Sequence, residues 1–162
     1  MNRRPLHALY LADSISLVGN AVSLIAVPWF VLVTTDSAAL TGLAVFFNFL
    51  PQVLAAFFGG VIVDRLGFRT TSVVADLASA GAVAAIPLIH TTVGIELWQL
   101  MSLVFLGALL DAPGATARVA LFPDLVELAG MGMERASGIR GGIQQGALLV
   151  GGPLGGVLVA EV

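Results

Sequence analysis

Asp111 and Arg118 are candidates for proton transfer, because they are ionisable residues inside an apolar stretch over residues 97–121. Their spacing places both on one face of a helix, about 10.5 Å apart along its axis. At that distance we expect each to have a separate partner. Burial disfavours a charged carboxyl group, so Asp111 is the candidate for a group that binds and releases protons. Arg118 could instead extend its stem to the membrane surface.

Other polar residues recur at helical spacing within apolar stretches. Asp13, Ser16, Asn20 and Ser23 share one stripe of a helix, and Asn48 and Gln52 lie one turn apart. The amides could bond between helices, and the serines could bond to carbonyl groups of their own helix. Polar groups at membrane depth also line water-filled cavities, which predicts a proton or substrate site. The candidate residues for that site are Asp111, Arg118, Asn20, Asn48, Gln52 and Gln145.

A short charged segment, residues 60–69, separates two of the apolar stretches. Asp64, Arg65 and Arg69 fall within six residues of one another. Gly60 precedes them and Gly67 lies between Arg65 and Arg69. Glycine permits the tight turn and close backbone approach that a side chain would block. This spacing predicts a charged hairpin between two membrane-spanning helices. From position alone, the arginines could serve only to fix the topology of the chain.

The composition indicates the elements that must position these residues. The chain is 58% hydrophobic and 10% charged, against about 25% charged residues in ordinary soluble domains. It therefore predicts an all-α membrane protein with lipid as a partner. The net charge of −3 argues against a nucleic-acid partner. With no cysteine and two distant histidines, we expect no metal site and no cofactor, and no enzyme motif is present.

Five membrane-spanning helices are expected, since each needs about 20 mostly apolar residues. Arginine is enriched in cytoplasmic loops, and the arginines outside the expected spans fall on one side of such a five-helix path. The N-terminus is therefore predicted to be cytoplasmic in the cell membrane. An uncleaved first helix is favoured over a signal peptide because no small-residue cleavage site is evident. The predicted spans are residues 8–35, 38–63, 71–90, 97–121 and 137–160.

The segment from Gly60 to Arg69 resembles the signature loop between helices two and three of the major facilitator superfamily. Residues 117–126 are similar to the end of helix four in its enterobactin-exporter and drug-efflux branch. The run that contains Gly152, Pro153 and Gly156 is similar to the helix-five element of its antiporters. The resemblance implies a twelve-helix fold in two halves that alternate in access, with Gly60, Asp64, Arg65, Gly67 and Arg69 as the gating loop.

The resemblance therefore implies a proton-coupled exporter of small amphipathic molecules, and the chain is expected to be a truncated N-terminal half. Its partners would be a small-molecule substrate and the missing C-terminal half. Two other classes stay open at this point. One is a non-transporting membrane subunit or a small oligomeric channel, which five spans and packing glycines also fit. The other is an intramembrane enzyme, for which Asp111 and Arg118 would be a small catalytic set.

Overall fold

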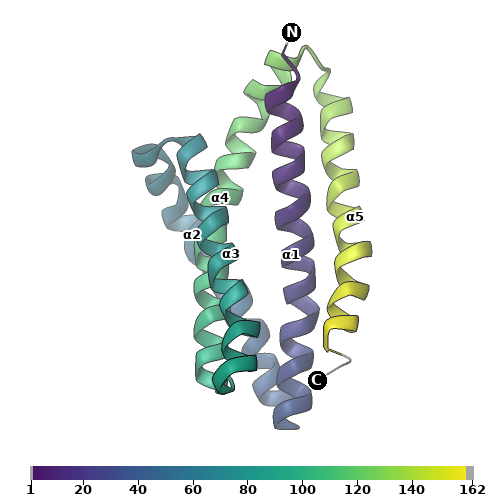
Figure 1. Ribbon diagram of the computed structural model, residues 1–162. Coiled ribbons are helices and arrows are strands. Elements are labelled where there is room, and N and C mark those ends of the chain that lie inside the picture. The colour runs from purple at the N-terminus through teal and green to yellow at the C-terminus, as the bar shows by residue number, and fades with distance from the viewer. Residues whose placement is uncertain (1, 160–162) are drawn as a thin grey trace. The chain divides into compact units, whose positions relative to one another are not determined.

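The computed structural model describes residues 2–159, apart from the side chains of residues 56, 59 and 62. Within that range the chain forms five α-helices joined by short turns, and each helix is long and apolar enough to cross a membrane (Figure 1). The expectation of an all-α membrane protein with five spans is confirmed. The helices are α1 (Arg4–Thr35), α2 (Ala38–Leu66), α3 (Phe68–Val93), α4 (Leu97–Ala129) and α5 (Met133–Val159).

The turn between the last two helices is shorter than the sequence suggested. Helix α4 continues beyond residue 121 to Ala129, and α5 begins at Met133 instead of residue 137. The extension is helical because Phe122, Val126 and Ala129 recur on one face and are buried there. The end of the fifth span, predicted at residue 160, lies outside the described residues.

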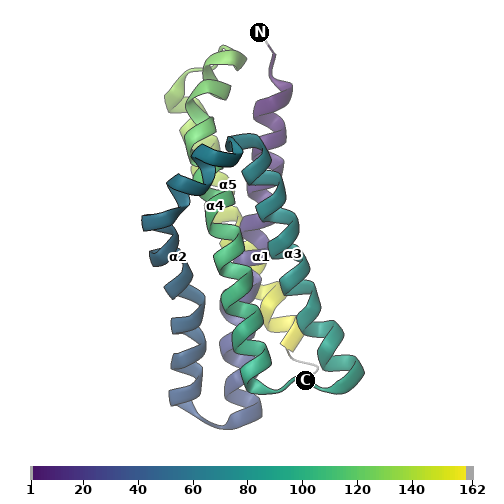
Figure 2. The same ribbon diagram turned by 90° about the vertical axis from the view of Figure 1, so that its left-hand side faces the viewer.

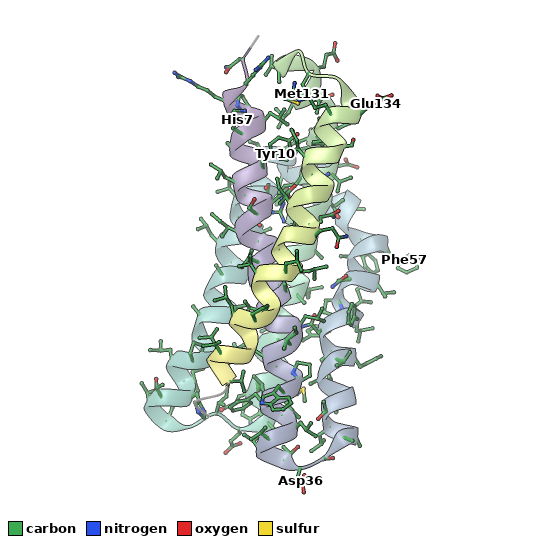
Figure 3. All side chains as sticks on the ribbon, turned by 90° about the vertical axis from the view of Figure 1, so that its right-hand side faces the viewer. His7, Tyr10, Asp36, Phe57, Met131 and Glu134 are labelled. Carbon is green, nitrogen blue, oxygen red and sulfur yellow. The ribbon has the colours of Figure 1, made fainter. Side chains whose placement is uncertain are left out.

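The chain divides into two compact units, which we describe separately. Unit 1 contains Met1–Phe30 and Arg118–Val162, and unit 2 contains Val31–Ala117. In unit 1, α1 and α5 lie side by side and run in the same direction, as Figures 1 and 3 show. The last turns of α4 complete this unit and run in the opposite direction.

An apolar cluster at the start of α1 holds the three helices of unit 1 together. It is formed by buried side chains from α1, α4 and α5, with the Tyr10 and Phe122 rings in contact at a centroid distance of 6.4 Å. Burial of each such side chain contributes about 1.5–3 kcal/mol relative to an exposed one in water. The buried members are Leu6, Leu9, Phe122, Val126, Ala129 and Ala136.

Two glycines let α5 approach the middle of α1 closely. A Cβ atom at Gly151 would lie 2.5 Å from the Ala21 Cβ atom and 2.9 Å from the Val18 carbonyl oxygen. A Cβ atom at Gly155 would lie 3.0 Å from the Val22 carbonyl oxygen. Small residues at a spacing of four are typical of tightly packed helices in membranes.

In unit 2, α4 contacts both α2 and α3 (Figure 2). The rings of Phe47 on α2 and Phe105 on α4 lie edge to face with centroids 6.0 Å apart. A Cβ atom at Gly107 of α4 would lie 3.3 Å from a methyl group of Val83 on α3. Where the three helices converge near the end of α2 they line an apolar cavity of about 330 Å³.

Candidate functional site

Asp13 is a charged residue buried within unit 1, with only 3% of its surface exposed. It lies nine residues after the start of α1, on the side of that helix that meets α4 and α5. Arg118 of α4 and Arg140 of α5 each approach one of its two carboxylate oxygens. Residues from three helices thus form an ion-pair cluster, which we call the Asp13 cluster.

Arg118 forms the first arm of the Asp13 cluster. Its Nε lies 2.8 Å from Asp13 Oδ1, and its Nη2 donates a hydrogen bond to the Ser16 hydroxyl at 3.2 Å. The Nε–H does not point along the Nε–Oδ1 line, so this contact is a close ion pair instead of an aligned hydrogen bond. Only 4% of Arg118 is exposed, and the interpretation that its stem extends to the membrane surface is therefore wrong.

Arg140 forms the second arm and is the more accessible one. Its Nε donates a hydrogen bond to Asp13 Oδ2 at 2.9 Å, and 19% of its side chain is exposed. The guanidinium carbon lies 5.0 Å from the centroid of the Phe122 ring, within range of a cation–π interaction. The aromatic face and the carboxylate together fix the direction of this arginine.

Tyr10 fastens α1 to α5 one turn before Asp13. Its hydroxyl donates a hydrogen bond to the Ala136 carbonyl oxygen at 3.0 Å. Figure 3 shows Tyr10 on α1 beside the first turns of α5, near Met131 and Glu134. Because the Ala136 carbonyl and Arg140 are one turn apart on α5, Tyr10 and Asp13 bind that helix at successive turns.

In the Asp13 cluster the buried charges of the carboxylate and the two arginines compensate one another. A charged side chain at membrane depth is costly unless it is paired, and here one carboxylate is shared by two guanidinium groups from different helices. Removing one member of a buried pair leaves an uncompensated charge, which costs about 3–5 kcal/mol. The cluster therefore joins three helices of unit 1 through one shared carboxylate.

The sequence did not identify Asp13 or Arg140 as site residues. Asp13 was recognised only as part of a polar stripe, and Arg140, within the predicted fifth span, was not singled out. An unpaired acid in the first span needed a basic partner in another span, and Arg140 was one of two arginines within the expected spans. That requirement could have predicted the pairing.

The predicted proton and substrate residues are divided between the units. Arg118, Asn20 and Gln145 belong to unit 1, and Arg118 is part of the Asp13 cluster. Asn20 and Gln145 are exposed within the described part of the chain. In unit 2, Asp111 and Asn48 are half-buried and Gln52 is exposed, while a further half-buried acid, Asp76, lies on α3.

The charged hairpin is tighter than a loop. Asp64 and Arg65 belong to the last turn of α2, and Arg69 belongs to the first turn of α3, so Gly67 is the single residue between the helices. Its backbone angles of φ 80° and ψ 146° lie in a region that favours glycine. The Gly67 N–H donates to the Val63 carbonyl oxygen at 2.8 Å. The three charged side chains and Gly60 are exposed.

On α5, the closest packing is displaced from the predicted glycines by one residue. Gly151 and Gly155 contact α1 most closely, whereas a Cβ atom at Gly152 would meet only the flexible end of Ile25 at 3.3 Å. Pro153 is exposed, and no atom lies within 4 Å of a Cβ atom at Gly156. No group of three or more His, Asp or Glu side chains among the described residues could hold a metal ion.

Comparison with known proteins finds relatives named as transporters. The multidrug efflux pump Tap of Mycobacterium tuberculosis is 34% identical over 164 residues, which cover 99% of this chain and 39% of the pump. YvqJ of Bacillus subtilis, an uncharacterized MFS-type transporter, is 25% identical over 129 residues, covering 80% of this chain and 31% of that protein. The chain is therefore similar in sequence to a multidrug efflux pump and to an MFS-type transporter.

A third relative of this transporter-like chain is macrolide efflux protein A of Streptococcus pyogenes. It is 25% identical over 120 residues, 74% of this chain and 30% of that protein. No family model matches the chain, and no solved structure matches it significantly. The resemblance inferred from the charged hairpin is confirmed, and the chain spans about two fifths of the length of the multidrug pumps.

Proposed function

We propose that this chain is part of a major facilitator transporter that exports small amphipathic molecules in exchange for protons. In this proposal the chain supplies five helices of the N-terminal half in the cell membrane. A C-terminal half, absent from this sequence, completes the alternating-access pair. The names of the relatives, a multidrug pump and a macrolide efflux protein, support export as the direction and amphipathic compounds as the substrates.

The observation that carries the proposal is the buried Asp13 cluster. A bundle that served only as an anchor would have no need of a carboxylate and two arginines at membrane depth, since each costs free energy to insert. Ionisable groups in such positions mark proton relays and substrate pathways. Since the relatives named for a function are pumps, we propose a transporter and no enzymatic activity.

Two carboxyl groups are proposed to take part in proton coupling. Asp111 lies half-buried within α4, as the sequence suggested, and Asp13 is buried between the arginines. We assign the substrate contacts to the amides of the predicted site. These are Asn20, Asn48, Gln52 and Gln145.

We assign the gate to the hairpin residues Asp64, Arg65 and Arg69, with Gly60 and Gly67 shaping the turn. Exposure of all three charged side chains leaves them accessible to an acidic or basic partner. They are proposed to contact the C-terminal half when the cytoplasmic side of the transporter is closed.

The proton assignment is tested with Asp111→Asn and Asp13→Asn in the full-length transporter reconstituted in liposomes. An imposed pH gradient should drive uptake or release of a fluorescent amphipathic compound in the wild-type protein. Each substitution removes a titrating group and should lower gradient-driven transport by at least about tenfold, the effect of about 1.4 kcal/mol. Asp124→Asn, at an exposed position of α4, is the matched control. Wild-type rates in both variants would refute proton coupling through these carboxyl groups.

A further inference from the structure

Unit 2 contains an apolar cavity that the proposed transport function does not use. It has a volume of about 330 Å³ and lies between α2, α3 and α4, so all the residues that line it belong to the same unit. Figures 1 and 2 show the last turns of α2 leaning away from α4, and residues of those turns line the cavity. We call this space the α2–α4 cavity.

The lining of the α2–α4 cavity combines small buried residues with large exposed ones. Ala55 of α2 and Ala75 of α3 are buried, with 8% and 7% of their surface exposed. The larger apolar side chains of the lining include four exposed ones, which form its rim. These are Phe58, Leu66, Val74 and Leu110. Alanines inside and larger apolar residues at the rim leave room for a slender apolar group that enters from outside.

The α2–α4 cavity offers no polar group to an occupant. Among the described residues that line it, Thr71 is the one with a polar side chain, and it is 3% exposed. Its hydroxyl donates a hydrogen bond to the Gly67 carbonyl oxygen at 2.9 Å. A buried water needs about two to four polar partners, and an amphipathic compound is held by a few placed polar groups. Hydrocarbon is therefore the occupant that this lining fits.

The charged hairpin lies beside the rim of the cavity. Leu66 of the rim follows Arg65 directly, and Phe58 is two turns before Arg65 on the same face of α2. Arg69 lies in the first turn of α3. Together with Asp64, the hairpin carries two guanidinium groups against one carboxylate, and all three side chains are exposed. A net positive charge at the end of two membrane-spanning helices is complementary to an anionic lipid headgroup.

We propose that the α2–α4 cavity binds one hydrocarbon chain of an anionic phospholipid, whose phosphate is bound by Arg65 and Arg69. An unfilled cavity lacks the dispersion contacts that its lining atoms would make with an occupant. Lipid tails surround the helices and are as apolar as the lining, so a tail can enter without transfer from water.

This inference goes beyond the proposed export and does not depend on proton coupling. The proposed gate engages the C-terminal half while the cytoplasmic side is closed. The hairpin arginines are then available to the lipid phosphate while that side is open.

Photo-cross-linking of the full-length transporter in liposomes tests the proposal. The probe is phosphatidylglycerol with a diazirine on one acyl chain, and mass spectrometry locates the labelled peptides. In the wild-type protein we expect labelling of the cavity-lining segments, residues 54–58, 66–78 and 109–113. Labelling should exceed that by phosphatidylcholine with the same acyl diazirine by about fivefold, because the arginines attract the anionic headgroup.

Two kinds of variant separate the chain contact from the headgroup contact. Ala78→Leu fills the cavity and should lose most of the labelling, and Ala75→Leu is a second filling variant. Ala80→Leu is the matched control, because Ala80 is exposed on the same helix and does not line the cavity; it should keep wild-type labelling. The double variant Arg65→Gln, Arg69→Gln changes exposed residues only, so it tests the headgroup contact even where a filled cavity prevents folding. It should reduce labelling by phosphatidylglycerol to the level of phosphatidylcholine.

Four results would contradict the proposal. Equal labelling of Ala78→Leu and Ala80→Leu would identify ordinary surrounding lipid. Equal labelling by the two probes, or wild-type labelling of the double arginine variant, would overturn the assignment of an anionic phospholipid.

Loss of the label on addition of the fluorescent amphipathic compound would make the cavity a substrate site. Unlabelled lining segments in the wild-type protein would show that another part of the transporter fills the cavity. These measurements report lipid binding, so the proposed export stands or fails separately, on the transport rates of Asp13→Asn and Asp111→Asn.

Discussion

A single carboxylate, that of Asp13, binds two buried or partly buried arginines of unit 1. Asp13 satisfies two arginines that would otherwise be costly at membrane depth, and its own burial is tolerable only because they are present. The charged hairpin follows the opposite logic, because Asp64, Arg65 and Arg69 are exposed and need no internal partner. At the scale of the residue, therefore, the two sets of charges differ in their environment: the Asp13 cluster is buried and the hairpin charges are exposed.

For the hairpin we expect Asp64→Asn to lower transport by about tenfold or more while membrane insertion stays normal. Asp64 lies in the last turn of α2, four residues before α3 begins, where the first N–H groups of a helix attract a carboxylate. A neutral amide could not form the charge-assisted contact with the C-terminal half that the proposed gate requires. Transport assays and membrane fractionation measure the two effects. Asp36→Asn alters an exposed acid at another helix connection and should behave as wild type; a variant absent from the membrane would instead indicate a folding role for Asp64.

At the scale of the elements, α1 and α5 are held together by shape as well as by charge. Gly151 and Gly155 remove the side chains that would separate the helices, and the atoms they approach include backbone carbonyl oxygens, which cannot rotate away. Gly67 has a similar importance between α2 and α3, since its positive φ lets one residue reverse the chain. The glycine-rich sequence of α5 predicted close packing, but the exact face depended on the neighbour.

We expect Gly151→Ala to lower the stability of the purified protein by about 1–3 kcal/mol, because the new methyl group would overlap α1. The substitution places a carbon 2.5 Å from Ala21 and 2.9 Å from a backbone oxygen. Thermal unfolding in detergent measures the effect. Gly146→Ala is the control on the same helix, where nothing lies within 4 Å, and alanine there should be neutral or stabilising by up to about 1 kcal/mol. Equal melting temperatures for the two variants would show that α1 and α5 do not pack as described.

At the scale of the whole molecule, five helices joined by short turns must alternate in direction across a membrane. The sidedness of that path is a proposal that follows from the arginines, with the N-terminus in the cytoplasm. The proposal places the α1–α2 turn outside and the α4–α5 turn inside. Because the chain contains no cysteine, single introduced cysteines report this without background.

We expect a membrane-impermeant maleimide to label Ala38→Cys in intact cells and to label Glu134→Cys only after the cells are permeabilised. Both positions are exposed at the beginning of a helix, so a difference in labelling reflects sidedness and not burial. The cysteine-free chain serves as the control for unspecific reaction. The reverse labelling pattern would show that the N-terminus lies outside.

The sequence by itself determined the class of protein, the number of long helices and the relationship to major facilitator transporters. These properties depend on composition, on the length of apolar runs and on the local spacing of Gly60, Asp64 and Gly67. All of these are features of the linear sequence and need no knowledge of which helices are neighbours. It also indicated that Arg118 needed a partner. Only the tertiary structure decided that this partner is Asp13, that Arg140 shares it, and that Gly151 and Gly155 meet α1. The physical reason is that a buried charge or a close helix contact is defined by what faces it, and the facing residues come from helices more than a hundred positions away in the chain.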